Sequence, residues 1–392
     1  MSLEILHVTP YFGPAWGYGG IPRVATALAG ALARRGHRVT VWTTDARDAA
    51  RRLGSDERNG VPGCDVRVFR NGSNRLAYHL QFFTPRGLRR AAARDARRFD
   101  IAHVHGHRHL LEVIGTRALR RAGVPYVSAP NGTAPRLERR FLMKRVWDLF
   151  WGQADLADAA AVLAVSEAER RQLHDMGVAP ARVRLLPNPI DLDEFAPPPD
   201  RARFRRAWSP DGEPIVLFLG KLTPRKRVDQ LVDVMPRLAH RQARLVIAGN
   251  DMGALGSVRA AVERHRLGAS TRFAGLLEGR DRLDALAAAD VVVYPSADEI
   301  FGLVALEALL CGTPVVVADG SGCGEIVATL EGGQVVPLGD ADAMAAAIDQ
   351  VLAAPASWRQ RARLAADTIR NRFGADVVAE QLEALYRELL DR

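Results

Sequence analysis

The stretch "LEILHVTPYFGPAWGYGGIPRVATALAGALARRGHRVTVWTT" (residues 3–44) decides the fold of this chain. It begins with a short apolar run (3–10), passes through a glycine-rich loop into an amphipathic stretch (21–36), and ends in a second apolar run (37–44). Pro22 in the first turn and Gly36 after the last turn are typical of a helix over 21–36. A strand, a helix and another strand in this order predict two parallel strands, because the helix carries the chain back to the edge where the first strand began.

The same alternation continues along the chain. Further apolar runs lie at 99–106, 125–132 and 159–166, and a second series opens at residue 213 and continues at 243–250, 270–277, 290–296 and 313–319. The runs are short and apolar on both faces, so we expect two doubly wound α/β units in tandem. The proline- and charge-rich segment 187–214 is the expected linker, and 373–392 is an expected final helix. Two such sheets facing each other would form a cleft lined by the loops after the strands.

Composition agrees with a two-domain protein. A chain of 392 residues, 48% of them hydrophobic, can fill two ordinary cores. The three cysteines are odd in number and lack metal-site spacing, the N-terminal residues lack the features of a signal peptide, and no run of about 18 apolar residues occurs. We therefore expect a cytoplasmic protein.

The formal charge of +9 is unevenly distributed. Residues 1–190 carry 30 Lys and Arg against 16 Asp and Glu, which gives +14, and the remainder carries −5. A basic half can face nucleic acid, an anionic membrane or an anionic small molecule. Alanines separate the arginines of 85–98, which favours a solvated helix face. The segment 135–151 interleaves bulky apolar side chains with four Arg and one Lys, so an interfacial membrane helix is a fair alternative to a solvated one there.

Two loops that follow predicted strands suit phosphate groups. The loop 10–22 has four glycines and ends with Gly19 and Gly20 at a helix start, where a backbone can approach a phosphate closely. In the second series, Lys221, Arg225, Lys226 and Arg227 follow a strand in quick succession and would neutralise a diphosphate from more than one side. A flexible surface loop and a solvated basic turn are the respective alternatives.

The tract "HVHGHRH" (103–109) places four histidines at alternate positions. If the strand continued, all four would share one face and would indicate a metal site. However, Gly106 and the helical stretch after it predict that the strand stops near 105. We therefore interpret His105 as a single histidine at the strand end that exchanges a hydrogen bond with a substrate.

The stretch "DEIFGLVALEALLCGTPVVV" (298–317) carries two glutamates around a Phe-Gly turn. We expect a helix from about Gly302 to Leu310 that ends at Gly312, with Glu299 in the loop before it and Glu307 in its second turn. The backbone N–H groups at 302–304 would then form an anion site. Carboxylates accept hydrogen bonds from vicinal hydroxyls. A ribose and a sugar ring flank the diphosphate of a nucleotide sugar, and one glutamate would suit each.

With these motifs the chain resembles the retaining glycosyltransferases of family 4, over nearly its whole length. The resemblance rests on the Gly-Gly loop, "DIAHVHG" (100–106), "LAVSEAERRQL" (163–173), "LPNPIDLDEF" (186–195), "LGKLTPRKRVDQL" (219–231) and above all "EIFGLVALEALLCGTPVV" (299–316). It implies the GT-B fold, with two facing Rossmann-like doubly wound domains and a cleft between them. An acceptor-binding domain would comprise 1–188 plus 375–392, and a nucleotide-sugar-binding domain 189–374.

The resemblance also implies roles for individual residues. Glu299 would contact hydroxyls of the donor sugar, Lys226 would stabilise the departing diphosphate, and His105 would touch the transferred sugar; these three are the expected catalytic residues. Lys221 stands where the family most often has arginine. Glu307 would hold the ribose. The other expected donor-binding residues are Gly20, Arg272, Phe273, Leu276, Phe301, Gly302, Leu303 and Val304.

The implied reaction moves a hexose from a UDP- or GDP-linked donor to a glycan or lipid-linked glycan, with retention of configuration and without a metal or other cofactor. The expected partners are the nucleotide sugar, the acceptor and an anionic membrane surface on which the protein is peripheral, as in surface-polysaccharide synthesis. A sugar-nucleotide epimerase of similar fold is the alternative. A metal-dependent hydrolase built on the histidine tract is a weaker alternative. A nucleic-acid-binding protein is another weak alternative, because no reader motif or stacking platform accompanies the basic half.

Overall fold

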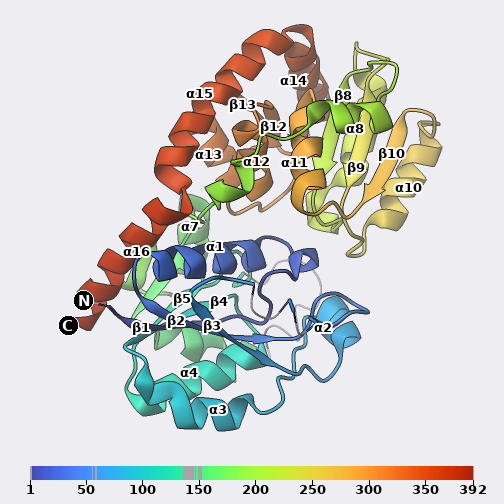
Figure 1. The fold of residues 1–392 in the computed structure, drawn as a ribbon. Coiled ribbons are helices and arrows are strands. Elements are labelled where there is room, and N and C mark those ends of the chain that lie inside the picture. Colours follow the sequence, from blue (N-terminus) through green and yellow to red (C-terminus); the bar gives the residue numbers. More distant parts are fainter. Residues whose placement is uncertain are drawn as a thin grey trace. The chain divides into compact units, whose positions relative to one another are not determined.

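The computed structural model describes residues 2–54, 56, 57, 60–135, 145, 147, 148 and 152–391. Contacts within the chain divide it into two compact units, residues 1–190 with 373–392 and residues 191–372. Each unit is built on one sheet of parallel strands with helices on its faces (Figure 1). The prediction of two doubly wound, Rossmann-like units is confirmed.

The first unit contains a seven-stranded sheet in the order β3-β2-β1-β4-β5-β6-β7. Its strands are β1 (Glu4–Val8), β2 (Arg38–Thr44), β3 (Cys64–Phe69), β4 (Ile101–His105), β5 (Tyr126–Ala129), β6 (Ala161–Ala164) and β7 (Val183–Leu185). Its helices are α1 (Gly20–Arg34), α2 (Asn74–Leu80), α3 (Leu88–Asp95), α4 (Leu110–Ala122), α6 (Gln153–Ala157), α7 (Glu167–Asp175) and α16 (Ala375–Leu390). The strand order reverses direction between β1 and β4, whose residues His7 and His103 are paired in register.

Two apolar cores lie on the two faces of this sheet. Alternate residues of the strands, such as Ile5 and Ile101, pack on one face with α1 and α16. The intervening residues, such as Leu6 and Ala102, pack on the other face with α3 and α4. Figure 1 shows α16 returning from the second unit to lie beside α1, as expected for the final helix. The predicted basic face at 85–98 is also confirmed, since the arginines of α3 and of the turn after it are exposed.

The second unit contains a six-stranded sheet in the order β10-β9-β8-β11-β12-β13. Its strands are β8 (Ile215–Leu219), β9 (Arg244–Ala248), β10 (Thr271–Gly275), β11 (Val291–Tyr294), β12 (Val315–Ala318) and β13 (Gly333–Val336). Its helices are α8 (Arg201–Trp208), α9 (Val228–Val234), α10 (Leu255–Arg264), α11 (Gly279–Ala288), α12 (Leu303–Leu310), α13 (Gly322–Leu330), α14 (Ala341–Ala353) and α15 (Pro355–Phe373).

The expected linker is partly wrong. Within 187–214, residues 201–208 form α8, which packs against α11 as part of the second unit. Asp200 caps this helix by accepting a hydrogen bond from the backbone of Arg203 at 2.9 Å. The high charge of the segment suggested a solvated linker, but Arg203 and Arg205 use that charge in ion pairs with Asp284 and Asp290.

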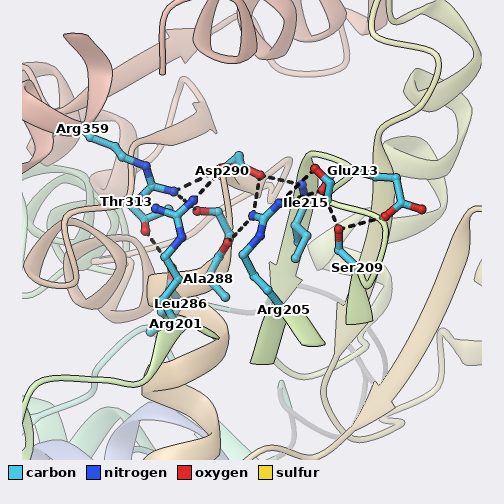
Figure 2. Close-up of polar contacts among 12 residues, drawn as sticks. Arg201, Arg205, Ser209, Glu213, Ile215, Leu286, Ala288, Asp290, Thr313 and Arg359 are labelled. Carbon is cyan, nitrogen blue, oxygen red and sulfur yellow. Dashed lines mark hydrogen bonds and ion pairs between the residues drawn. The ribbon is translucent and has the colours of Figure 1, made fainter. Parts of the chain in front are cut away.

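An ionic cluster closes the amino-terminal edge of the second sheet. Asp290 immediately precedes β11 and accepts a hydrogen bond from the backbone of Ile215, the first residue of β8, at 2.9 Å. Figure 2 shows the guanidinium groups of Arg201, Arg205 and Arg359 turned toward this carboxylate. Asp290 therefore joins α8 and α15 to the two central strands.

Candidate active site

The carboxyl ends of β8 and β11 form the switch point of the second sheet. β9 and β10 lie on one side of these two neighbouring strands, and β12 and β13 lie on the other, so the chain leaves β8 and β11 in opposite directions. The loop after β8 includes the short helix η6 (Pro224–Lys226), and the loop after β11 leads into α12. The backbone N–H of Ala297 donates to the carbonyl of Arg225 at 3.0 Å, which ties the two loops together.

Lys226 and Glu299 meet at this switch point as an ion pair. The Lys226 side chain is 8% exposed, and its ammonium lies 4.5 Å from the centre of the Tyr294 ring at the end of β11. Burial alone would raise the pKa of Glu299, but Lys226, Arg225 and Lys221 hold it below its usual value. Glu299 is therefore a carboxylate at neutral pH, surrounded by cations, and 18% of its side chain remains exposed.

The turn before α12 is a tight glycine turn. Gly302 caps the helix with φ of 78°, and a Cβ added there would lie 2.3 Å from the sulfur of Cys323. Only glycine fits this left-handed position. Leu303 and Val304 follow in the first turn, where amide groups have no partner within the helix and the dipole favours an anion. The predicted helix start and its end at Gly312 are confirmed, and Phe301 is buried beside the turn.

Glu307 lies in the second turn of α12, as predicted, and is 5% exposed. Its carboxylate forms an ion pair with Arg282 of α11, which also pairs with Glu194. Sequence reasoning missed Arg282. The available signal was weak: a charged residue one helical turn before the buried Leu286, on the face that α11 turns to the core.

Three further predicted donor-binding residues lie at the edge of the same sheet. Arg272 and Phe273 belong to β10, and Leu276 follows it. Phe273 and Leu276 are 36% and 42% exposed, so an apolar surface is open at the carboxyl end of this strand. The guanidinium of Arg272 donates to the backbone carbonyls of Gly268 and Thr271, which turns its charge away from that surface.

Gly20 and His105 lie at the corresponding switch point of the first sheet. Gly20 is the first residue of α1, which follows the loop after β1, and His105 is the last residue of β4. The strand end predicted near 105 is confirmed. The side chain of His105, however, has no exposed surface. Contact between His105 and a sugar would require the side chains that cover it to move, and that contact stays a prediction.

His105 belongs to a buried row of imidazoles on the face of the sheet that α1 and α16 cover. Its Nε2 lies 3.0 Å from Nδ1 of His7, and its ring stacks on His103 with centres 4.3 Å apart. His103 in turn lies 2.7 Å from the hydroxyl of Tyr386 on α16. Burial, together with the neighbouring imidazoles, holds the pKa of His105 well below its usual value, so the ring is neutral.

The remaining two histidines of the tract, His107 and His109, lie beyond the end of β4. His109 caps the start of α4, and its Nδ1 lies 2.6 Å from the carboxylate of Glu112, whereas His107 lies beside Asp148, which pairs with Arg108. Among the residues that the structure describes, no group of three or more His, Cys, Asp or Glu side chains is arranged to hold a metal ion.

The proposed membrane-binding segment 135–151 lies almost wholly outside the described residues. Within the described part of the chain, no helix is both long enough and apolar enough to cross a membrane.

Comparisons with known proteins agree with this geometry. Residues 18–194 match the family model for glycosyltransferase family 4, and residues 200–370 match the model for glycosyl transferases group 1. A D-inositol 3-phosphate glycosyltransferase of Kineococcus radiotolerans is 32% identical over 99% of this chain and 94% of the relative. The chain belongs to glycosyltransferase family 4. The family and the enzyme class predicted from the sequence are thereby confirmed, which favours a transferase over the epimerase alternative.

Two further matches extend the comparison. A GDP-mannose-dependent alpha-mannosyltransferase of Mycobacterium tuberculosis is 32% identical over 63% of this glycosyltransferase and 63% of the relative. Among solved structures, HepE of Anabaena in complex with UDP-glucose superimposes with a TM-score of 0.79 at 21% identity, over 98% of this chain and 100% of that one. The likeness is one of fold and confirms the GT-B class.

Proposed function

We propose that this glycosyltransferase moves a hexose from a UDP- or GDP-linked donor to an acceptor hydroxyl, with retention of configuration and without a metal. The observation that carries the proposal is the Lys226–Glu299 ion pair beside the start of α12, at the switch point where ligands bind in doubly wound sheets. A site that combines cations, a helix start and an ionised glutamate suits a diphosphate joined to a hydroxyl-rich ring.

Each part of the donor has a place in this arrangement. The diphosphate would lie at the amide groups of Leu303 and Val304, with Lys226 and Lys221 neutralising its charge. Glu299 would accept hydrogen bonds from the sugar and Glu307 from the ribose. The base would meet the apolar surface of Phe273 and Leu276. Gly20 and His105, at the switch point of the first sheet, stay predicted contacts of the donor.

The lysines and the helix start would also take the place of a metal in the reaction. The bond from the anomeric carbon to the diphosphate breaks, and a bond to the acceptor oxygen forms on the same face. The acceptor proton passes to the leaving diphosphate, whose charge Lys226 stabilises as it develops. Glu299 is held by cations as a carboxylate, which suits a hydrogen-bond acceptor to the sugar better than a proton donor.

Activity of purified variants tests the assignment. Glu299→Ala and Lys226→Ala should each lower transfer to about 1% or less, the scale expected when a charge-stabilising group is lost. Arg237→Ala, which removes an exposed ion pair with Asp342, is the matched control. Transfer by the wild-type enzyme should persist in the presence of a metal chelator. NMR of the product should show the same anomeric configuration as the sugar of the donor. Variants of Glu299 or Lys226 with wild-type turnover would contradict the roles.

The acceptor has two candidates. The charge of the first 190 residues supports a glycan or lipid-linked glycan at an anionic membrane, on which the protein would be peripheral. The similarity to D-inositol 3-phosphate glycosyltransferases favours an inositol phosphate as the second candidate. Sedimentation with anionic vesicles at low salt tests the first, and product formation with inositol 3-phosphate tests the second. A thermal-shift screen against UDP- and GDP-hexoses would identify the donor.

A further inference from the structure

Arg282 is a buried cation for which the proposed reaction has no use. It lies on α11, is 2% exposed, and pairs with Glu307 of α12 and with Glu194 of the short helix η5 (Leu192–Phe195). We call these three residues the Arg282 triad. They come from three separate segments of the chain. The segment that contains Glu194 lies where the chain enters the second unit.

The carboxylates of Glu307 and Glu194 favour the charged form of the buried Arg282 guanidinium. Burial alone would lower its pKa, but Glu307 and Glu194 raise it above the ordinary value. A buried guanidinium without a carboxylate partner is costly, and so is a buried carboxylate without a cation. The planar fork of arginine also fixes the orientation of the carboxylate that it pairs with, which a lysine does not do.

The two carboxylates depend on Arg282 to different degrees. The Glu194 side chain is 34% exposed, so water can solvate its charge. The Glu307 side chain is 6% exposed, so its charge relies mainly on the guanidinium. A carboxylate has about four lone-pair sites, and those that Arg282 does not occupy can accept hydrogen bonds from hydroxyl groups.

We infer that Arg282 is a positioning residue for Glu307, whose carboxylate it orients through their ion pair so that Glu307 accepts hydrogen bonds from the ribose hydroxyls of the donor nucleotide. The inference rests on the proposed function, in which Glu307 holds the ribose. Arg282 does not touch the donor and acts through Glu307. It thereby sets how strongly the enzyme distinguishes a ribonucleotide from a nucleotide that lacks a ribose hydroxyl.

Calorimetric binding of a nucleoside diphosphate and its 2′-deoxy analogue tests the inference. UDP and GDP are first titrated into the wild-type protein, and the tighter one is carried forward with its deoxy form. The wild type should bind the deoxy analogue about 10- to 100-fold more weakly, because a hydrogen bond to a charged group is lost. Glu307→Gln should reduce this discrimination, and Arg282→Met should reduce it to within about threefold.

Two more variants separate positioning from a purely structural role. Arg280→Met is the matched control, because Arg280 lies on the same helix but donates to the carbonyls of Pro197 and Pro198. It should discriminate as the wild type does. Arg282→Lys keeps a positive charge that supports folding but loses the fork, and should lose part of the discrimination. Arg282→Met should also raise the KM for the donor about tenfold or more while kcat changes less than about threefold, because the triad lies away from the transferred sugar.

The outcomes distinguish the inference from the proposed function. If the wild type binds neither UDP nor GDP, the proposed function fails. If Glu307→Gln discriminates as the wild type does, Glu307 does not hold the ribose, and the inference fails with that assignment. If Glu307→Gln loses discrimination but any folded Arg282 variant retains it in full, the inference alone is overturned.

Discussion

Gly302 shows how one residue determines the shape of the candidate site. Its positive φ and the sulfur of Cys323 both exclude a side chain. We expect Gly302→Ala to lower the free energy of unfolding of the second unit by roughly 2–4 kcal/mol, because the left-handed backbone and the crowding each cost about 1–2 kcal/mol. It should also weaken binding of nucleoside diphosphates, because the start of α12 must shift. Urea unfolding and calorimetry measure the two effects.

Gly320 provides the control for this substitution. It also has a positive φ, of 67°, but a Cβ added there would have no atom within 4 Å. Gly320→Ala should therefore show the backbone cost of about 1–2 kcal/mol without the crowding, and should leave nucleotide binding unchanged. Equal losses in the two variants would show that contact with Cys323 does not matter.

Residues close in sequence could be assigned from the sequence, and residues brought together by the fold could not. The spacing of Glu299, the Phe-Gly turn and Glu307 correctly placed Glu299 in the loop before the predicted helix and Glu307 in its second turn. The partner of Glu307 lies on another helix, where a buried arginine looks like an ordinary surface residue of an amphipathic stretch. The histidine tract was visible, but His7 lies 98 residues from His105, and Tyr386 lies 283 residues from His103.

Among the elements, the cluster around Asp290 (Figure 2) is a scaffold at the amino-terminal ends of β8 and β11, whereas the candidate site lies at their carboxyl ends. We expect Asp290→Asn to destabilise the second unit by roughly 2–4 kcal/mol, because three guanidinium groups lose a carboxylate that is only 14% exposed. The activity per folded molecule should stay unchanged, since β8 and β11 separate the cluster from the switch point. Unfolding curves and kcat below the transition test both statements.

Asp342→Asn is the control for this element. Asp342 pairs with Arg237 but is 82% exposed, so its loss should change the free energy of unfolding by less than about 1 kcal/mol. If Asp290→Asn lowered kcat in the folded protein, the cluster would act on the site and would not be a scaffold alone.

The strands that the sequence did not reveal, β3, β7 and β13, are edge strands. β3 and β7 are partly exposed and alternate apolar with charged residues, and β13 begins with a glycine. An edge strand needs only one apolar face and few residues, so it lacks the two-sided apolar run by which the central strands were recognised. The switch points depend on the central strands, which is why the site could be located although three strands were missed.

At the scale of the whole molecule, the chain passes between the units at two adjacent points. The backbone of Ile190 receives a hydrogen bond from Ala375 at 2.9 Å and donates one to Phe373 at 2.7 Å. The amphipathic pattern of 373–392 predicted the helix, but its return to the first unit followed from the family resemblance. Its packing against α1 and the contact of Tyr386 with His103 make α16 part of the first core.

Acid should unfold the first unit before the second. His7, His103, His105 and His107 are buried in the first unit, and burial lowers the pKa of each, to about 3 for His7 and His107. The unfolded chain takes up these protons near pH 6.5, so their contribution to stability is complete above pH 6.5 and is lost as the pH falls. Glu169 has the opposite sign. Burial raises its pKa from 4.5 to about 7, so its contribution is complete below pH 4.5 and is lost as the pH rises toward 7.

Asp155 acts in the same direction as Glu169, because burial raises the pKa of Asp155 to about 6. The four histidines release more stability on acidification than these two carboxyl groups add. Between pH 6.5 and 4.5 the free energy of unfolding of the first unit should therefore fall by on the order of 2–3 kcal/mol per pH unit.

Equilibration in urea at several pH values, followed by a brief hydrogen-exchange pulse at one fixed pH and mass spectrometry, measures the unfolding of each unit separately. His7→Leu should make this dependence shallower by about 1.4 kcal/mol per pH unit, and Glu169→Gln should make it steeper by a similar amount. The exposed His79, replaced by Gln, is the control. Equal acid sensitivity of the two units, or an unchanged slope in His7→Leu, would show that the buried imidazoles do not govern the stability of the first unit.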